Sequence, residues 1–263
     1  MTTQVIGQYQ YSWTPRTQKI YESITSLRIP EARTLISQDK KANASNLIYP
    51  LLESYADFYQ LFLNENKAEY SRMYPAFEQR IQLFEEGPKQ SPYYLHSLAL
   101  AHLHKSLIAI RFNKNLEAAL DFRKAFLLFK ANKKAFPNFT PTDVYYGLMS
   151  TVIGTIPKGY QWMANVLGMT GKISEGNALV LKYINSKDAY SNQCRNEALF
   201  VYPYLVMNFE GNKKKTFDFI EKTDFDLVNN HLHAYMATNL YLNNQQSQKA
   251  LQIASNINPS NPY

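Results

Sequence analysis

Residues 152–176 read VIGTIPKGYQWMANVLGMTGKISEG, and the role of this stretch decides between two kinds of fold. It holds five of the nine glycines in the chain, namely Gly154, Gly159, Gly168, Gly171 and Gly176. Glycine-rich stretches either cradle phosphate groups with their backbone or let helices turn and approach each other closely. The first reading predicts a nucleotide-binding fold, and the second predicts a jointed array of helices.

A phosphate-binding loop of the form G-x-x-x-x-G-K-[ST] does not fit the stretch. If Gly171-Lys172 is the end of the motif, a glycine is required at position 166, which is Val166. A serine or threonine is required after the lysine, but Ile173 is there. The motif also follows a buried strand, whereas the residues before this loop have helical spacing. A dinucleotide-binding fingerprint fails for want of a strand–turn–helix unit.

A connector between helices explains the same residues. Pro157 keeps Ile156 out of helical conformation and starts a new helix. Gly168 follows an apolar helical turn, where a left-handed residue is expected. Gly171 relaxes the connection, and Gly176 lets a neighbouring backbone approach closely. We therefore predict a structural hinge formed by Pro157, Gly168, Gly171 and Gly176.

The rest of the chain is also helical in pattern. The pairs Thr14-Pro15, Ser91-Pro92 and Thr140-Pro141 each place a capping hydroxyl before a proline at the first helical position. The 20 Tyr and 15 Phe against only 9 Gly suit long packed helices. The helices predicted from apolar spacing are 15–28, 30–41, 47–64, 67–86, 91–112, 115–135, 141–155, 157–167, 172–185, 189–210, 213–222, 229–242 and 247–257. Two internal prolines, Pro75 and Pro203, are expected to break or kink their helices.

Short connections between these helices favour antiparallel neighbours. Ala118, Phe122 and Ala125 have the small–large–small spacing of a second tetratricopeptide helix, and Tyr241 precedes Ala250 as in that repeat. No clean 34-residue period is present. We predict an all-α fold of antiparallel helix hairpins stacked as a tetratricopeptide-like right-handed solenoid. Its expected parts are N-terminal hairpins (1–140), a glycine-rich connector (141–188) and C-terminal hairpins (189–263).

Several short motifs together resemble one known family. The run IGTIP at 153–157, followed by a helix and LGMTGKISEG at 167–176, is similar to the central signature of the family that joins animal tetratricopeptide repeat protein 39 to a fungal inclusion-body clearance protein. Bacterial relatives, mostly from Bacteroidetes, resemble the chain more closely, through WTP at 13–15, SPYYL at 91–95 and Phe136-Pro137. The resemblance implies an all-helical array with scaffold or binding roles and no catalytic residues. It also implies further repeats after Tyr263 and a bacterial envelope location with the signal removed, with the cytoplasm as the alternative.

Composition excludes several classes of protein. The single cysteine, Cys194, rules out an internal disulfide and a four-cysteine zinc site. No apolar run approaches the roughly 20 residues of a transmembrane helix. Residues 91–140 carry 8 Lys/Arg and 2 Asp/Glu, which we interpret as a solvated face. We expect no nucleic-acid partner, because basic motifs interleaved with aromatic residues are missing.

No catalytic constellation is visible. The histidine pairs His102/His104 and His231/His233 are spaced by two, so their members point about 200° apart on a helix and cannot share a metal. Cys194 is interpreted as a buried structural thiol. We therefore expect no enzyme activity, no cofactor and no metal.

Recognition of another molecule remains as the expected function. Stacked hairpins form a concave face lined by first helices, which suits a partner peptide or helix. The candidate partner-binding residues are Tyr94, His102, Lys105, Tyr145, Tyr146, Tyr235 and Asn239, each with core packing as the alternative role. The alternative function is a carrier of a small apolar ligand or lipid within the array. Tyr9, Tyr11 and Trp13 are expected to cover the first helix rather than to form a docking arm. Apolar residues of helix 247–257 predict weak self-association through the C-terminal edge.

Overall fold

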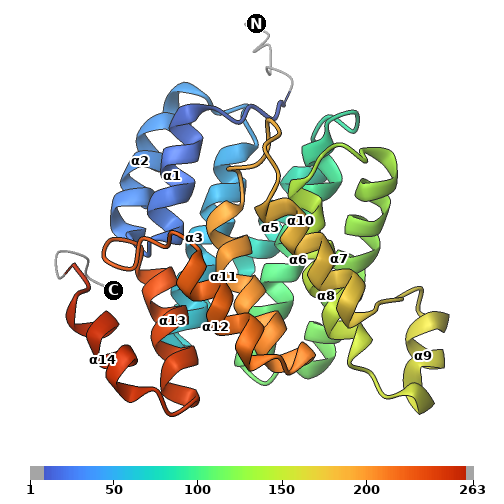
Figure 1. Cartoon of the computed structure of the whole chain (residues 1–263). Coiled ribbons are helices and arrows are strands. Elements are labelled where there is room, and N and C mark those ends of the chain that lie inside the picture. Colours follow the sequence, from blue (N-terminus) through green and yellow to red (C-terminus); the bar gives the residue numbers. More distant parts are fainter. Residues whose placement is uncertain (1–8, 259–263) are drawn as a thin grey trace, which may run out of the picture. The chain divides into compact units, whose positions relative to one another are not determined.

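The computed structural model describes residues 9–258, and in this range the chain is all-helical, without a β-strand (Figure 1). The predicted fold class is thus confirmed at the level of an all-α protein. The helices are α1 (Pro15–Thr25), α2 (Ile29–Ala42), α3 (Ile48–Asn64), α4 (Lys67–Met73), α5 (Pro75–Glu85), α6 (Pro92–Arg111), α7 (Asn115–Ala135), α8 (Pro141–Gly154), α9 (Gln161–Val166), α10 (Ile173–Ile184), α11 (Arg195–Leu205), α12 (Lys213–Lys222), α13 (His231–Asn243) and α14 (Ser247–Ser255). A 3-10 helix, η1 (Lys158–Tyr160), precedes α9, and a π-helix, η2 (Val206–Glu210), follows α11.

Two of the three predicted hydroxyl caps are present. Thr14 Oγ1 accepts a hydrogen bond from Thr17 N at 3.2 Å, and Thr17 Oγ1 accepts one from Thr14 N at 2.8 Å. Ser91 Oγ accepts from the backbone N–H two residues later at 3.3 Å. The third prediction is wrong, because Thr140 has helical backbone angles and makes no cap hydrogen bond. Its hydroxyl instead donates to Asp188 Oδ1 at 3.1 Å.

The two internal prolines act in different ways. α4 ends at Met73 and α5 begins at Pro75, so the predicted helix 67–86 is broken there, as expected. Pro203 remains inside α11, and the backbone changes to a π-helix from Val206 onward. Because proline cannot donate to the carbonyl four residues earlier, its helix lacks one bond at this point. The π turn that follows determines where the residues before Gly211 lie.

One predicted helix begins later than the sequence indicates. The expected helix 189–210 starts only at Arg195. The hydroxyl of the buried Tyr183 donates to the Tyr190 carbonyl at 2.8 Å and accepts from Cys194 N at 3.1 Å. The intervening residues therefore wrap around a tyrosine side chain of α10, an arrangement that apolar spacing does not reveal.

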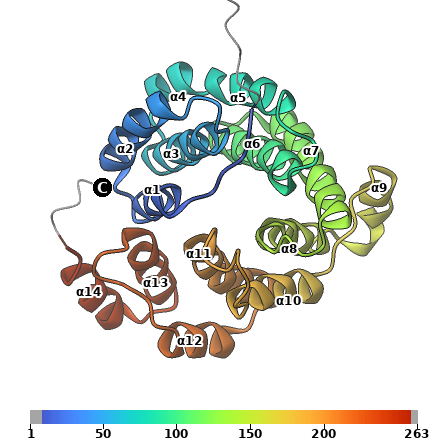
Figure 2. The same ribbon diagram turned by 90° about the horizontal axis from the view of Figure 1, so that it is seen from above.

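The described residues form two compact units, 9–24 with 29–135 and 25–28 with 136–258. In the first unit α6 lies beside α7 and also contacts α3 and α5 (Figure 2). The buried side chains of Ser54 and His104 join α3 to α6, with Oγ and Nδ1 3.0 Å apart.

The N-terminal aromatic residues pack onto the first unit. The ring of Trp13 lies 5.9 Å from that of Tyr21 on α1 and stacks on Tyr93 at 6.3 Å. Tyr11 stacks on Tyr93 at 5.9 Å. The prediction that this segment covers the first helix is confirmed for Trp13, whereas Tyr11 packs on Tyr93 of α6.

In the second unit, α8 and α10 lie side by side, and α11 contacts α10, α12 and α13 (Figures 1 and 2). α13 and α14 form a hairpin around a buried cluster that includes Met236, Leu240, Tyr241 and Ala250. The α8–α10 pair borders a cavity in this unit.

Candidate functional site

α8 and α10 approach so closely that glycine is required where they cross. A methyl group on Gly147 would lie 2.7 Å from the Gly176 carbonyl oxygen, and one on Gly176 would overlap both the Gly147 carbonyl and Thr151. A methyl group on Gly171 would overlap the backbone of Ser150. The predicted close approach at Gly176 is confirmed. For Gly171 the sequence predicted only a relaxed connection. The structure shows that its lack of a side chain also lets the residues before α10 lie against the backbone of α8.

A short helical excursion, η1 and α9, connects α8 to α10. Gly168 has φ of +78°, and its N–H donates to the Asn165 carbonyl at 2.9 Å. The next N–H, of Met169, donates to the Ala164 carbonyl at 2.9 Å. This pattern is a Schellman motif, and it confirms the predicted left-handed residue at Gly168. Pro157 is extended, with φ −55° and ψ 145°, and marks the start of the excursion as expected.

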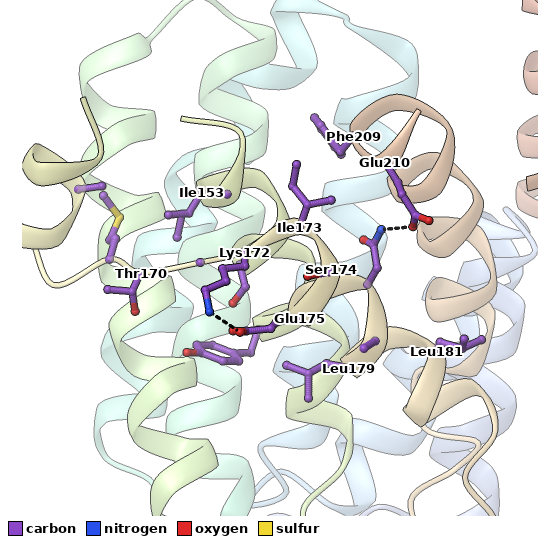
Figure 3. Close-up of a pocket in the computed structure, with 18 of the residues that line it drawn as sticks. Ile153, Thr170, Lys172, Ile173, Ser174, Glu175, Leu179, Leu181, Phe209 and Glu210 are labelled. Atoms are coloured by element: carbon purple, nitrogen blue, oxygen red, sulfur yellow. Dashed lines mark hydrogen bonds and ion pairs between the residues drawn. The ribbon is translucent and has the colours of Figure 1, made fainter. Parts of the chain in front are cut away.

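A cavity of about 1060 Å³ lies beside the α8–α10 pair (Figure 3). It is bordered by residues of α8, α9, α10, α11, η2, α12 and the loop before α10. Its apolar lining includes Ile153, Met169, Ile173, Leu179 and Phe209. Its polar lining includes Lys172, Glu175, Asn177, Glu210 and Lys215. The volume is near the upper end of the roughly 300–1,000 Å³ typical of ligand pockets.

A chain of hydrogen bonds joins four elements along one side of this cavity. Thr151 Oγ1 donates to Asn177 Oδ1 at 3.0 Å, and Asn177 Nδ2 donates to Glu210 Oε2 at 3.0 Å. Lys215 Nζ lies 3.0 Å from both carboxylate oxygens of Glu210. Figure 3 shows Glu210 pointing from η2 toward α10. The π-helix therefore places a carboxylate where α10 and α12 can both bind it.

The electrostatics of this network keep its members in fixed ionisation states. Partial burial acts to raise the pKa of Glu210, but hydrogen bonds from Lys215 and Asn177 outweigh it and leave that pKa lowered. Burial acts to lower the pKa of Lys215, and the bonds to Glu210 outweigh it, so that pKa is raised. Burial raises the pKa of Tyr146 and of Tyr202. The cavity thus presents an ion pair and two neutral hydroxyl groups at neutral pH.

Four of the predicted partner-binding residues lie in the second unit. Tyr146 borders the cavity. Tyr145 is buried, and its hydroxyl donates to Glu197 Oε2 at 2.6 Å. Tyr235 is exposed on α13. Asn239 accepts a hydrogen bond from another asparagine of α13 at 3.0 Å.

The other three predicted residues lie on α6 in the first unit. Tyr94 is half-buried. His102 is buried, with Nδ1 2.7 Å from Asp121 Oδ1 of α7. Lys105 Nζ lies 3.3 Å from Asp121 Oδ2 and 2.9 Å from Glu78 Oε2 of α5. His102 and Lys105 therefore join α6 to its neighbouring helices.

Sequence reasoning missed the residues that make the cavity polar, above all Asn177, Glu210 and Lys215. Their partners are far apart in the chain, since 33 residues separate Asn177 from Glu210. The available signal was Pro203 inside a predicted helix that ends before Gly211. Such a proline indicates altered helical geometry, and π turns occur often at functional sites.

The remaining candidate groups are held in structural contacts. Cys194 is buried, as predicted, and burial raises the pKa of its thiol. His231 and His233 each lie within hydrogen-bond distance of a backbone carbonyl, at 3.1 and 3.0 Å. Within residues 9–258 no cluster of three or more His, Cys, Asp or Glu side chains is arranged to hold a metal ion.

No helix of the described range is both long enough and apolar enough to cross a lipid bilayer. No protein-family model, no curated protein and no solved structure matches the chain.

Proposed function

We propose that the chain is a non-enzymatic interaction protein that binds a short peptide or helix of a partner protein in the cavity of its second unit. The observation that carries this proposal is the cavity of about 1060 Å³, where apolar side chains lie beside the Glu210–Lys215 ion pair. Peptide-binding sites combine apolar pockets for side chains with a few placed polar groups that set orientation. The ionised groups beside the cavity bind each other, which suits recognition better than proton transfer.

We also propose that the helix pairs belong to a tetratricopeptide-like right-handed array. Support comes from two hairpins, one that α6 forms with α7 in the first unit and one that α13 forms with α14 in the second. Ala118 and Ala125, at the predicted small positions of α7, are buried. Tyr241 and Ala250 lie in one buried cluster, as expected for that repeat. Membership of the tetratricopeptide repeat protein 39 family, through its Bacteroidetes-type relatives, is part of the same proposal.

A second candidate function is transport of a small apolar ligand or lipid. It is favoured by the cavity volume, which a single molecule of drug-like size fills. In this alternative the apolar lining contacts the ligand, and Glu210 and Lys215 fix its polar end.

The test of the main proposal is to fill the cavity. Ala178 of α10 borders it and is exposed, so Ala178→Trp adds a large side chain there without disturbing the core. Random-peptide phage display selects binders to the wild-type chain, and fluorescence anisotropy then measures their affinity. We expect the selected peptides to bind Ala178→Trp about tenfold more weakly or worse, a loss of about 1.4 kcal/mol.

The matched control is Ala254→Trp, which adds the same side chain at an exposed position of α14 and should leave affinity unchanged. Equal peptide binding by wild type and Ala178→Trp would contradict the proposal. Native mass spectrometry of the freshly purified chain examines the alternative. A bound mass that is present in wild type and lost in Ala178→Trp, without peptide binding, would favour the ligand carrier.

A further inference from the structure

The excursion between α8 and α10 exposes an unusual number of large apolar side chains. The exposed fractions are 60% for Tyr160, 63% for Trp162, 43% for Met163, 78% for Val166 and 44% for Leu167. In Figures 1 and 2, α9 stands apart from α8 and α10. Clustered exposed apolar residues of this kind mark contact sites for proteins or membranes.

α9 carries its large apolar side chains on the side away from the rest of the unit, which is the opposite of an ordinary surface helix. The residues of α9 that border the cavity are Gln161, Ala164 and Asn165. At about 100° per residue these three lie on one side of the helix. On the other side lie Trp162, Met163, Val166 and Leu167. A helix in water usually turns its apolar side inward, so this arrangement indicates an apolar environment outside.

The C-terminal end of the excursion has a defined backbone geometry. The Schellman motif at Gly168 ends α9, and Gly171 holds the returning chain against the backbone of α8. The outer apolar side chains are thus carried by a short helix whose end has a defined local backbone geometry.

Charge and residue type together favour a lipid surface. Between Asp143 and Glu175 the sequence has no acidic residue, and its charged residues there are Lys158 and Lys172, of which Lys172 lies after residue 170 and pairs with Glu175 at 2.7 Å. Lys158 is exposed and lies two residues before Tyr160 in the chain. Tyrosine and tryptophan prefer the boundary between lipid headgroups and acyl chains, and lysine is attracted to anionic headgroups.

The size of the segment argues against a second protein as its partner. A stable protein interface buries about 800 Å² and roughly 20–30 residues on each side. The excursion spans only residues 156–170, and part of it faces the cavity. Insertion of a few side chains to a depth of roughly 5–10 Å is what a bilayer surface accommodates.

We propose that residues 156–170 are a membrane-docking segment, which inserts Trp162, Val166 and their apolar neighbours into the surface of an anionic phospholipid bilayer. The segment acts as an interfacial anchor and does not span the bilayer. This inference does not depend on what occupies the cavity, because it concerns the opposite side of α9.

The chain offers a direct probe, since Trp13 and Trp162 are its two tryptophans. Trp13→Phe, with an unchanged circular dichroism spectrum as the fold check, makes Trp162 the sole indole. The variant is mixed with vesicles of phosphatidylcholine alone or with phosphatidylglycerol added. We expect a blue shift of Trp162 emission, quenching by brominated acyl chains and co-flotation with the vesicles.

Three variants give the proposal its sharpest test. Trp162→Ser combined with Val166→Ser should weaken vesicle partitioning about tenfold or more. Lys158→Gln should weaken it about fivefold, on the phosphatidylglycerol-containing vesicles alone. The control Leu116→Ser changes an apolar side chain of α7 that is 76% exposed, and it should leave partitioning unchanged.

Three results would overturn the inference. The first is no flotation of wild type with either vesicle, and the second is full flotation of the Trp162→Ser/Val166→Ser variant. The third is a dimer in sedimentation velocity that this double variant dissociates, because the occupant would then be a second copy of the chain.

Discussion

At the scale of single residues, the glycines of residues 152–176 are required for different structural reasons, and one of them is not required by its surroundings. Gly171 and Gly176 have neighbouring backbone where a side chain would begin. Gly168 is required for its left-handed conformation, with φ of +78°. Around Gly159, apart from its own residue and its neighbours along the chain, no atom lies within 4 Å of the position of a Cβ. The sequence predicted the conformation of Gly168 because helix ends follow local rules. It could not predict that the backbone of Gly147 would be the partner of Gly176.

These differences predict that the same glycine-to-alanine substitution changes the free energy of unfolding by different amounts at two positions. Gly176→Ala places a methyl group against the Gly147 carbonyl and Thr151, so α8 and α10 must separate. We expect it to lower the free energy of unfolding by about 1–3 kcal/mol. Gly159→Ala has free space and should change it by less than about 1 kcal/mol. Urea denaturation measures both, and equal stability of the two variants would contradict the close approach.

At the scale of elements, α7 shows how helix pairing uses small residues. Ala118 and Ala125 are buried, whereas Ala119, on another side of the same helix, is exposed. The spacing of the first two alanines was visible in the sequence, and it predicted which side of the helix packs. The change from α11 to the π-helix after Pro203 was not visible as such, because the same proline signal fits a break, a kink or a π turn.

The second prediction therefore concerns α7. Ala125→Leu adds three carbons to a fully buried position and should lower the free energy of unfolding by about 1–3 kcal/mol. Ala119→Leu makes the identical change at an exposed position and should alter it by less than about 0.5 kcal/mol. Thermal unfolding followed by circular dichroism compares the two. A smaller loss in Ala125→Leu than in Ala119→Leu would show that the packing side is wrongly placed.

At the scale of the whole molecule, both units contain buried neutral histidines. Burial lowers the pKa of His96 and of His104 to about 3 in the first unit, and Arg80 and His96 add to the effect on His104. Burial also lowers the pKa of His233 to about 4 in the second unit. Between these values and the unfolded value of about 6.5, the unfolded chain binds more protons than the folded chain.

Stability should consequently decrease as the pH falls. The contribution of each neutral histidine is complete above about pH 6.5 and is lost progressively as pH falls toward the folded pKa. At pH 5 each of the three should lower the free energy of unfolding by about 2 kcal/mol. Urea titrations between pH 7.5 and 4.5 measure the slope of the unfolding free energy against pH, which reports the number of protons taken up on unfolding. His96→Phe should reduce that number by about one in the acidic part of the range. An unfolding free energy that is constant over this range would contradict the burial of these side chains.

Local sequence patterns predicted the all-α class and most of the helices. Apolar spacing, hydroxyl caps, prolines and the left-handed glycine act within a few residues of the chain, so their effects can be read from local order. The cavity was not predictable in this way, because it forms between segments that are distant in the chain. Its Asn177–Glu210–Lys215 network depends on a π turn that brings distant residues together, and its wall depends on two backbones meeting at Gly147 and Gly176. Contacts between distant residues arise from packing of the whole unit, and no local pattern in the chain encodes them.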